Sequence, residues 1–253
     1  MAKFFVDPEC IMGSHIYIED KEDIKHLVKV LRAKAGDEVS VSDKEVWEYT
    51  GEIEEITQDQ VIIKITDKQR FATEPQAKVT LYQGVPKAGK METIIQKNVE
   101  LGVNAIVPVF MGRTVVVEKG NFDKKLERWQ KISDEAVKQC KRGIIPEIRR
   151  NVNWKEMMED IRYAGYDLLI CTYENEDNRS IKDALREFAD AGAGGADEAK
   201  VAVVIGPEGG FEDKEIEDMR SLGAEIVTLG KTTLRTETAG MAALAMIMYE
   251  LEL

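Results

Sequence analysis

Two glycine-bearing loops near the C-terminus constrain the fold of this chain most strongly. The first is residues 206–211 (GPEGGF) and the second is residues 229–239 (LGKTTLRTETA). Each follows a short apolar segment that predicts a buried strand, 201–205 and 224–228, and each precedes a segment that predicts a helix. Glycines at a strand end let the backbone approach a ligand closely, because no Cβ intervenes. In open α/β sheets ligands bind at this edge, so the loops predict a small-molecule pocket built largely from main chain.

The familiar nucleotide-binding motifs are missing from the sequence. No Gly-x-Gly-x-x-Gly follows a predicted strand, and no Gly-x-x-x-x-Gly-Lys-Ser/Thr occurs anywhere in the 253 residues. A Rossmann dinucleotide site and a P-loop are therefore not expected.

Strand and helix patterns alternate from residue 78 to the C-terminus. Strands are expected at residues 79–84, 105–110, 166–172, 201–205 and 225–229, and helices at residues 91–101, 124–141, 154–164, 180–189, 212–222 and 239–251. This alternation predicts an α/β domain with a mostly parallel sheet covered by helices on both faces. The Gly/Ala-rich tract 191–199 is expected to be a flexible loop.

The N-terminal part has a different pattern. Short β-rich segments separated by turn residues predict a small barrel, with one helix at residues 21–34. The strands are expected at residues 3–6, 38–42, 47–56 and 61–66. Residues 71–75 are a plausible linker, because Pro75 disfavours the continuation of a regular element.

Composition limits the classes of protein. No run of eighteen apolar residues and no signal-peptide pattern occurs, which predicts a soluble cytoplasmic protein without a membrane partner. The chain has only three cysteines, which are widely spaced, and two histidines. This set argues against a disulfide framework and against a structural metal site, so no metal is predicted.

Charge is unevenly distributed along the acidic chain. The net charge is −12, yet residues 76–151 carry 15 Lys/Arg and 8 Asp/Glu, a net of +7. This basic third fits an electrostatic footprint for RNA. A solvated helical surface explains the charge equally well.

The two glycine loops, taken together and in order, resemble the C-terminal region of the SPOUT RNA methyltransferases. Within that superfamily the chain is similar to the bacterial enzymes that methylate N3 of a uridine in 16S ribosomal RNA. Three further segments share the resemblance: residues 26–32 (HLVKVLR), 91–102 (METIIQKNVELG) and 128–142 (RWQKISDEAVKQCKR).

The resemblance implies a two-domain homodimeric enzyme. Residues 1–72 would form a PUA-like RNA-binding β-barrel, and residues 73–253 a SPOUT domain with a deep trefoil knot. S-adenosyl-L-methionine would be the cofactor, and 16S rRNA within the assembled or assembling small subunit would be the partner. An enzyme that acts on a ribose 2′-hydroxyl or a tRNA base, or a non-catalytic ribosome-assembly factor, are the alternatives.

The resemblance also implies the site residues. The cofactor would bind to Leu169, Thr172, Gly206, Pro207, Glu208, Gly209, Gly210, Leu229, Gly230, Leu234, Thr238 and Ala239. The RNA would contact Lys3, Arg32, Lys87, Lys97 and Arg142. The catalytic residues would be Arg235, Glu237 and Gln139.

Each of these assignments has a plainer explanation. The glycines could simply form tight turns between strand and helix. Thr236 or Thr238 could cap the last helix, where Glu237 suits the helix dipole. Gln139 and Arg142 could form an ordinary polar helix end. Arg235 is harder to explain in this way, because a cation at a helix N-terminus is misplaced; we expect it to face the cofactor carboxylate, an RNA phosphate or the uracil carbonyl.

Two positions depart from the family pattern. Lys3 stands where an arginine is common, which keeps the charge but loses the bidentate geometry. Glu212 and Asp213 stand where a serine or threonine usually caps the helix, so Asp213 is expected to cap it one position later.

Overall fold

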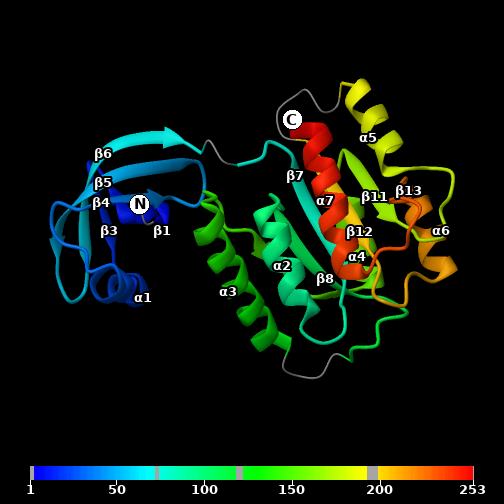
Figure 1. Ribbon diagram of the computed structural model, residues 1–253, viewed down its shortest axis with the longest axis horizontal. Coiled ribbons are helices and arrows are strands. Elements are labelled where there is room, and N and C mark those ends of the chain that lie inside the picture. Colours follow the sequence, from blue (N-terminus) through cyan, green and yellow to red (C-terminus); the bar gives the residue numbers. More distant parts are fainter. Residues whose placement is uncertain (1–2, 72–73, 118–121, 193–198, 253) are drawn as a thin grey trace. The chain divides into compact units, whose positions relative to one another are not determined.

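The computed structural model describes residues 3–71, 74–117, 122–192 and 199–252. Its elements are labelled in Figure 1. The chain forms two compact units: residues 1–74 together with 137–145, and residues 75–136 together with 146–253. The expected boundary at residues 72 and 73 lies outside the described residues and stays a prediction.

The first unit contains a six-stranded sheet in the order β1-β4-β5-β6-β3-β2. Its strands are β1 (Lys3–Phe5), β2 (Ile11–Met12), β3 (His15–Ile18), β4 (Glu38–Ser42), β5 (Trp47–Ile56) and β6 (Val61–Arg70). Only β1 and β4 pair in parallel. Register shifts in the β5–β6 pairing bend this hairpin, and at one of them Gly51 leaves room for the Ile63 side chain. Closure of the sheet into a barrel stays a prediction.

The helix of the first unit is shorter than predicted. The α-helix α1 (Lys21–Lys25) begins after Asp20, whose side chain accepts hydrogen bonds from two backbone N–H groups of the first turn. It passes into a π-helix, η2 (His26–Val30). Arg32 then adopts a left-handed conformation with φ 54°, and Ala33 donates its N–H to the carbonyl oxygen of Leu27. The expected helix over 21–34 is therefore wrong at its end, because this left-handed turn stops it.

The second unit contains a parallel sheet in the order β10-β8-β7-β12-β11-β13, with β9 paired to β8. The strands are β7 (Lys78–Gly84), β8 (Ala105–Phe110), β9 (Glu147–Ile148), β10 (Val152–Asn153), β11 (Leu168–Thr172), β12 (Lys200–Ile205) and β13 (Glu225–Val227). The prediction of an α/β architecture with a parallel sheet is confirmed.

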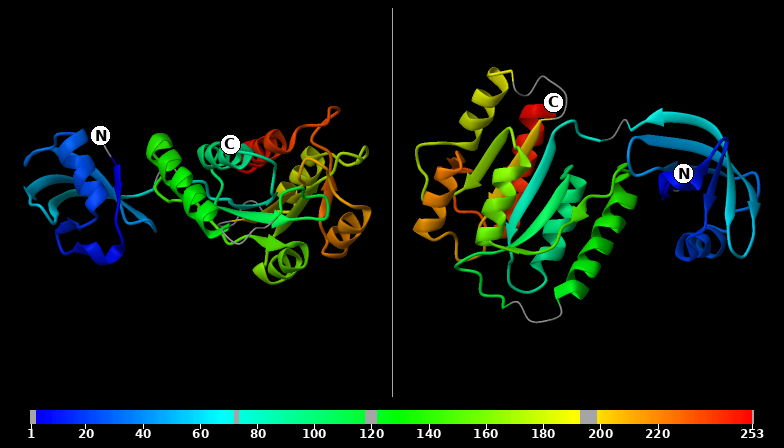
Figure 2. Two further views of the ribbon diagram at one scale, coloured as in Figure 1. Left: turned by 90° about the horizontal axis from the view of Figure 1, so that it is seen from below. Right: turned by 180° about the vertical axis from the view of Figure 1, so that it is seen from behind.

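Helices cover both faces of this sheet (Figure 2). They are α2 (Lys90–Glu100), α4 (Trp154–Ala164), α5 (Ile181–Asp190), α6 (Asp213–Ser221) and α7 (Thr236–Glu252). Helix α3 (Phe122–Cys140) belongs to the second unit up to Ala136 and to the first unit from Val137. The side chains of α4 and α6 share one buried cluster with alternate residues of the central strands. On the other face α7 packs against β7 and β12 and against α2 and α5.

The starts of α2 to α6 lie within two residues of the expected positions. Helix α7 begins at Thr236, three residues earlier than expected. Helix α6 begins at Asp213 with Glu212 in the cap position, so the expected cap at Asp213 is wrong. At this helix start the carboxylate of Glu215 accepts hydrogen bonds from the backbone N–H groups of Glu212 and of Gly112, both at 2.8 Å. Most of the expected flexible loop at residues 191–199 lies outside the described residues.

None of the helices in the described part of the chain is both long and apolar enough to cross a membrane.

Candidate functional site

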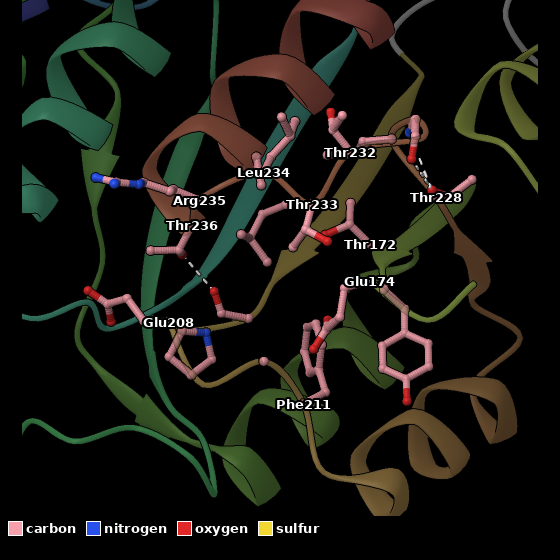
Figure 3. Close-up of a pocket in the computed structure, with 18 of the residues that line it drawn as sticks. Thr172, Glu174, Glu208, Phe211, Thr228, Thr232, Thr233, Leu234, Arg235 and Thr236 are labelled. Carbon is pink, nitrogen blue, oxygen red and sulfur yellow. Dashed lines mark hydrogen bonds between the residues drawn. The ribbon is translucent and has the colours of Figure 1, made fainter. Parts of the chain in front are cut away.

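A pocket of about 440 Å³ lies in the second unit, at the carboxyl ends of its strands (Figure 3). Three segments form most of its wall: residues 172–177 after β11, residues 205–211 after β12, and residues 228–239 after β13. Both glycine-bearing loops therefore contribute to one cavity. Parallel strands place their carboxyl ends at one edge of the sheet, and this edge is where α/β sheets bind ligands.

Most of the expected cofactor residues line this pocket. They are Thr172, Gly206, Pro207, Glu208, Gly210, Leu229, Gly230, Leu234 and Ala239. Three others do not line it. Leu169 is buried in the cluster beneath α4 and α6, three residues before the end of β11. Gly209 faces Arg113, whose guanidinium donates to its carbonyl oxygen at 3.1 Å, and Thr238 is exposed in the first turn of α7.

A buried hydrogen-bond chain fastens the two loops to the sheet. The Thr236 hydroxyl donates to the carbonyl oxygen of Gly206 at 2.6 Å and accepts from Nε2 of Gln83 at 2.8 Å. Nε2 of Gln83 also donates to the carbonyl oxygen of Gly84 at 3.0 Å. The side chain of Thr236 therefore does not act as the helix cap that the sequence suggested, because its hydroxyl forms the hydrogen bonds that join the loops to the sheet.

Two glycines permit close contacts with or within the first glycine loop. A Cβ on Gly84 would lie 2.5 Å from the backbone nitrogen of Pro207. Gly210 has φ +68°, and a Cβ there would overlap the carboxylate of Glu174. A side chain at either position would displace main chain or a pocket carboxylate, so these glycines do more than close a turn.

Sequence reasoning missed several residues of the pocket wall. Tyr173, Glu174 and Asp177 follow β11, and Phe211 ends the first glycine loop. The first three were signalled only by their place directly after a predicted strand, and Phe211 only by its place in the first glycine loop.

A cluster of three charged residues stands at the rim. The Lys90 ammonium lies 3.0 Å from Glu208 Oε1 and 3.2 Å from Glu237 Oε2. Hydrogen bonds that the ammonium donates to Glu208 and to Glu237 raise the pKa of Lys90 above its usual range. A hydrogen bond from its own backbone, together with Lys90, lowers the pKa of Glu237. Burial would raise the pKa of Glu208, but Lys90 and backbone N–H groups bring it below the usual value.

Arg235 immediately precedes α7 and lines the pocket. Its side chain is exposed and extends toward the side of the pocket where Glu208 lies (Figure 3). Among the described residues it has no hydrogen-bonded or ion-paired side-chain partner, although its charge contributes to the lowered pKa of Glu237.

Two of the expected RNA-contacting cations are buried in the first unit. Arg142 is 7% exposed and its Nη2 lies 2.8 Å from Glu74 Oε2. Lys3 is also 7% exposed and lies 3.1 Å from Glu48 Oε2. Each charge is already paired within the unit, and contact of these side chains with an RNA phosphate stays a prediction.

The other expected substrate residues are more accessible. Arg32, Lys87 and Gln139 are exposed. Lys97 is half-buried and pairs with Glu100 at 2.8 Å. Arg32 and Gln139 belong to the first unit, whereas Lys87 and Lys97 belong to the second.

Within residues 3–71, 74–117, 122–192 and 199–252, no group of three or more His, Cys, Asp or Glu side chains could hold a metal ion.

Comparison with known proteins places the chain in a family. Residues 73–248 match the RNA methyltransferase domain and residues 18–66 match the RNA methyltransferase PUA domain. Ribosomal RNA small subunit methyltransferase E of Bacillus subtilis (strain 168) is 31% identical over 92% of this chain and 89% of its own length. The protein of the same name from Aquifex aeolicus (strain VF5) is 34% identical over 69% of each chain.

A solved structure agrees with these relatives. The ribosomal RNA small subunit methyltransferase E of Neisseria gonorrhoeae, bound to S-adenosyl methionine, is 25% identical and superposes with a TM-score of 0.81 over 98% of this chain and 97% of its own. On this evidence the chain belongs to the RNA methyltransferase domain family, and within it to the ribosomal RNA small subunit methyltransferase E proteins.

Proposed function

We propose that this protein transfers the methyl group of S-adenosylmethionine to N3 of a uridine in 16S ribosomal RNA. The observation that carries the proposal is the pocket of about 440 Å³ between two glycine-bearing loops, in a chain that belongs to a ribosomal RNA methyltransferase family.

The pocket fits this cofactor in size, because ligand sites of small molecules occupy about 300–1,000 Å³. Leu229, Leu234 and Ala239 supply apolar wall for the adenine, and Gly206 and Gly210 allow main chain to approach. When bound, the cofactor supplies an electrophilic methyl group on a sulfonium centre.

The catalytic task of the protein is to hold the uracil in line and to favour loss of its N3 proton. This proton is weakly acidic, so a fixed cation near O2 or O4 would stabilise the developing anion. Arg235 is the candidate, because its guanidinium is exposed at the pocket and unpaired among the described side chains.

Glu237 suits a positioning role in this scheme. Its pKa is lowered, so it stays ionised and is a weak proton acceptor. It shares Lys90 with Glu208 and keeps that ammonium at the rim of the pocket, close to the start of α7. Gln139 stays a proposed catalytic residue, supported by its exposure at the end of α3.

RNA binding is proposed for the exposed cations. Lys87 on the second unit and Arg32 on the first carry unburied positive charge, and Lys97 is half-exposed. Phosphate contacts of this kind position the RNA without reading its sequence. The match of residues 18–66 to an RNA methyltransferase PUA domain supports a role for the first unit in holding RNA.

The same proposal includes a homodimer that forms through the second unit. It also includes a trefoil knot in the chain path of that unit. Helix α7 is apolar on nearly every side, yet Ala245, Met246 and Tyr249 are exposed. An apolar helix face of this kind usually marks an interaction site. Tyr249→Glu should give a monomer in analytical ultracentrifugation, whereas Tyr163→Glu on α4, which is also exposed, should not.

Methyl transfer to defined RNA tests the proposed function. The purified protein is incubated with labelled S-adenosylmethionine and either unmodified 16S rRNA or small subunits assembled from it, and the digested RNA is analysed by mass spectrometry. One N3-methyluridine is the expected product. A 2′-O-methylated ribose, or methylation of tRNA alone, would reassign the target. Cofactor binding without transfer to any RNA would favour a non-catalytic assembly factor.

A further inference from the structure

Two carboxylates of the pocket wall have no partner in the described part of the chain. Glu208 is paired with Lys90, so its charge is compensated. Glu174 and Asp177 also line the pocket, but neither side chain forms a hydrogen bond or ion pair with another described residue. The wall after β11 therefore carries two carboxylates that line the cavity and form no direct ion pair with a described residue.

Glu174 is the better placed of the two. It stands two residues beyond the end of β11, and Figure 3 shows its side chain extending toward Phe211. Its carboxylate lies against Gly210, where the missing Cβ and φ of +68° leave the space that it occupies. The loop that would approach the cofactor thus also accommodates this charge.

The charge of the cofactor makes this placement significant. S-adenosylmethionine carries a sulfonium and an ammonium group against one carboxylate, and the product S-adenosylhomocysteine keeps the ammonium but loses the sulfonium. An opposite charge across a few ångströms in a partly enclosed site is favourable. We propose that Glu174 is the counter-ion for a cationic group of the cofactor. This inference rests on the proposed function, because it presumes that this pocket holds the cofactor.

Three probes in isothermal titration calorimetry separate the sources of the effect. S-adenosylmethionine has both cations, S-adenosylhomocysteine has only the ammonium, and 5′-methylthioadenosine has neither but keeps the adenosine. Glu174→Gln removes the charge and keeps the shape. We expect it to weaken S-adenosylmethionine binding by about tenfold, the scale of one charge pair in a partly exposed site. Binding of 5′-methylthioadenosine should not change.

The second probe identifies the cation. If S-adenosylhomocysteine binds the variant as it binds the wild type, Glu174 faces the sulfonium. If its affinity falls as much as that of S-adenosylmethionine, Glu174 faces the ammonium. Gly210→Ala, which displaces the same carboxylate without removing it, should show the same order of losses.

The control is Asp177→Asn, which removes the other unpartnered charge of the pocket. Equal losses of S-adenosylmethionine affinity in Glu174→Gln and Asp177→Asn would show that only the overall negative potential of the pocket matters. That result would overturn the proposed contact between Glu174 and the cofactor. A loss for 5′-methylthioadenosine would point to the ribose and also overturn it, as would unchanged binding of all three probes. Wild-type protein that binds no S-adenosylmethionine would refute the proposed function itself.

Discussion

The hydroxyl of Thr236 lies 2.6 Å from the carbonyl oxygen of Gly206 and so joins the first residue of helix α7 to the first glycine loop. Gln83, at the end of β7, donates to the same hydroxyl at 2.8 Å. Both side chains are buried. The two loops that form the pocket are thus fixed to each other and to the central sheet by one threonine.

Removing this hydroxyl should loosen both loops. Thr236→Val leaves the Gly206 carbonyl and one N–H of the Gln83 amide without a partner, while the amide keeps its bond to the Gly84 carbonyl. A buried polar group left unsatisfied costs about 1–3 kcal/mol. We expect a lower free energy of unfolding in urea and weaker S-adenosylmethionine binding. Thr236→Ser keeps the hydroxyl and should behave almost as the wild type. A larger loss in Thr236→Ser than in Thr236→Val would mean that the methyl group, not the hydrogen bonds, is what matters.

Gly84 should tolerate no side chain. The Cβ of Gly84→Ala would lie 2.5 Å from the backbone nitrogen of Pro207, so the first glycine loop must move. Overpacking of this kind costs about 1–3 kcal/mol. We expect reduced stability and a marked loss of cofactor affinity by calorimetry. Gly89→Ala is the matched control, because the nearest atom to its Cβ would lie 3.9 Å away.

Arg142 should matter for stability rather than for direct RNA contact. It is paired with Glu74, which is 8% exposed and also accepts the N–H groups of Gly143 and Ile144. Breaking a buried pair by removing one partner costs about 3–5 kcal/mol. Arg142→Ala should therefore lower the urea midpoint strongly. Lys87→Glu should leave that midpoint unchanged and weaken RNA binding in a salt-dependent way. A stable Arg142→Ala protein with a selective RNA defect would contradict this assignment.

The Lys90 cluster should respond to acid. Glu208 and Glu237 have lowered pKa values, so their contribution to stability is present above the ordinary glutamate pKa and is lost as the pH falls through the lower folded values. The pKa of Lys90 is raised, so the contribution of its charge to stability is lost only above about pH 10.4, the ordinary lysine value.

Thermal unfolding of Lys90→Met and wild type can test this dependence. The Tm of the variant should be lower near neutral pH, and the gap should close well below about pH 4.3, the ordinary glutamate pKa, because both carboxylates are then neutral. Lys97→Met, which breaks one exposed pair with Glu100, serves as the control. A gap that persists unchanged at the lowest pH would show that Lys90 acts through packing alone.

The periodic features of the sequence predicted the second unit well. Apolar runs alternating with amphipathic segments indicated a parallel sheet with helices on both faces, and β8 and α4 have the expected bounds. The position of both glycine loops after strands indicated where a pocket would form. These inferences succeed because they depend on local patterns and on the geometry common to parallel sheets.

Contacts between distant residues were not predictable in this way. Nothing in the sequence pairs Arg142 with Glu74, 68 residues away, so a buried ion pair looked like an exposed helix end. Segment 137–145, which belongs to the first unit, carried no composition signal either. Gly209 was predicted to line the pocket because its sequence neighbours do. In the structure it lies against Arg113, in the loop after β8, which donates a hydrogen bond to its carbonyl oxygen. Glu174 was missed because a single carboxylate after a strand is not a pattern.

Arg235 provides the sharpest test of the proposed chemistry. It stands directly before α7, where the helix dipole disfavours a cation, and no described side chain pairs with it. A bound anion, or negative charge that develops on the uracil, would compensate it.

Two roles for Arg235 predict different kinetics. If it holds the cofactor carboxylate, Arg235→Ala should weaken S-adenosylmethionine binding, and saturating cofactor should restore the rate. If it stabilises the developing uracil anion, cofactor affinity should hardly change while kcat falls about a hundredfold, the scale of losing one preorganised donor. We expect the second result, since Arg235 extends to the side of the pocket where Glu208 lies (Figure 3). Lys231→Ala, which removes another cation of the pocket wall, should retain most of the single-turnover rate. An Arg235→Ala enzyme with normal affinity and a normal single-turnover rate would exclude both roles, because neither the cofactor nor the transition state would then depend on this guanidinium.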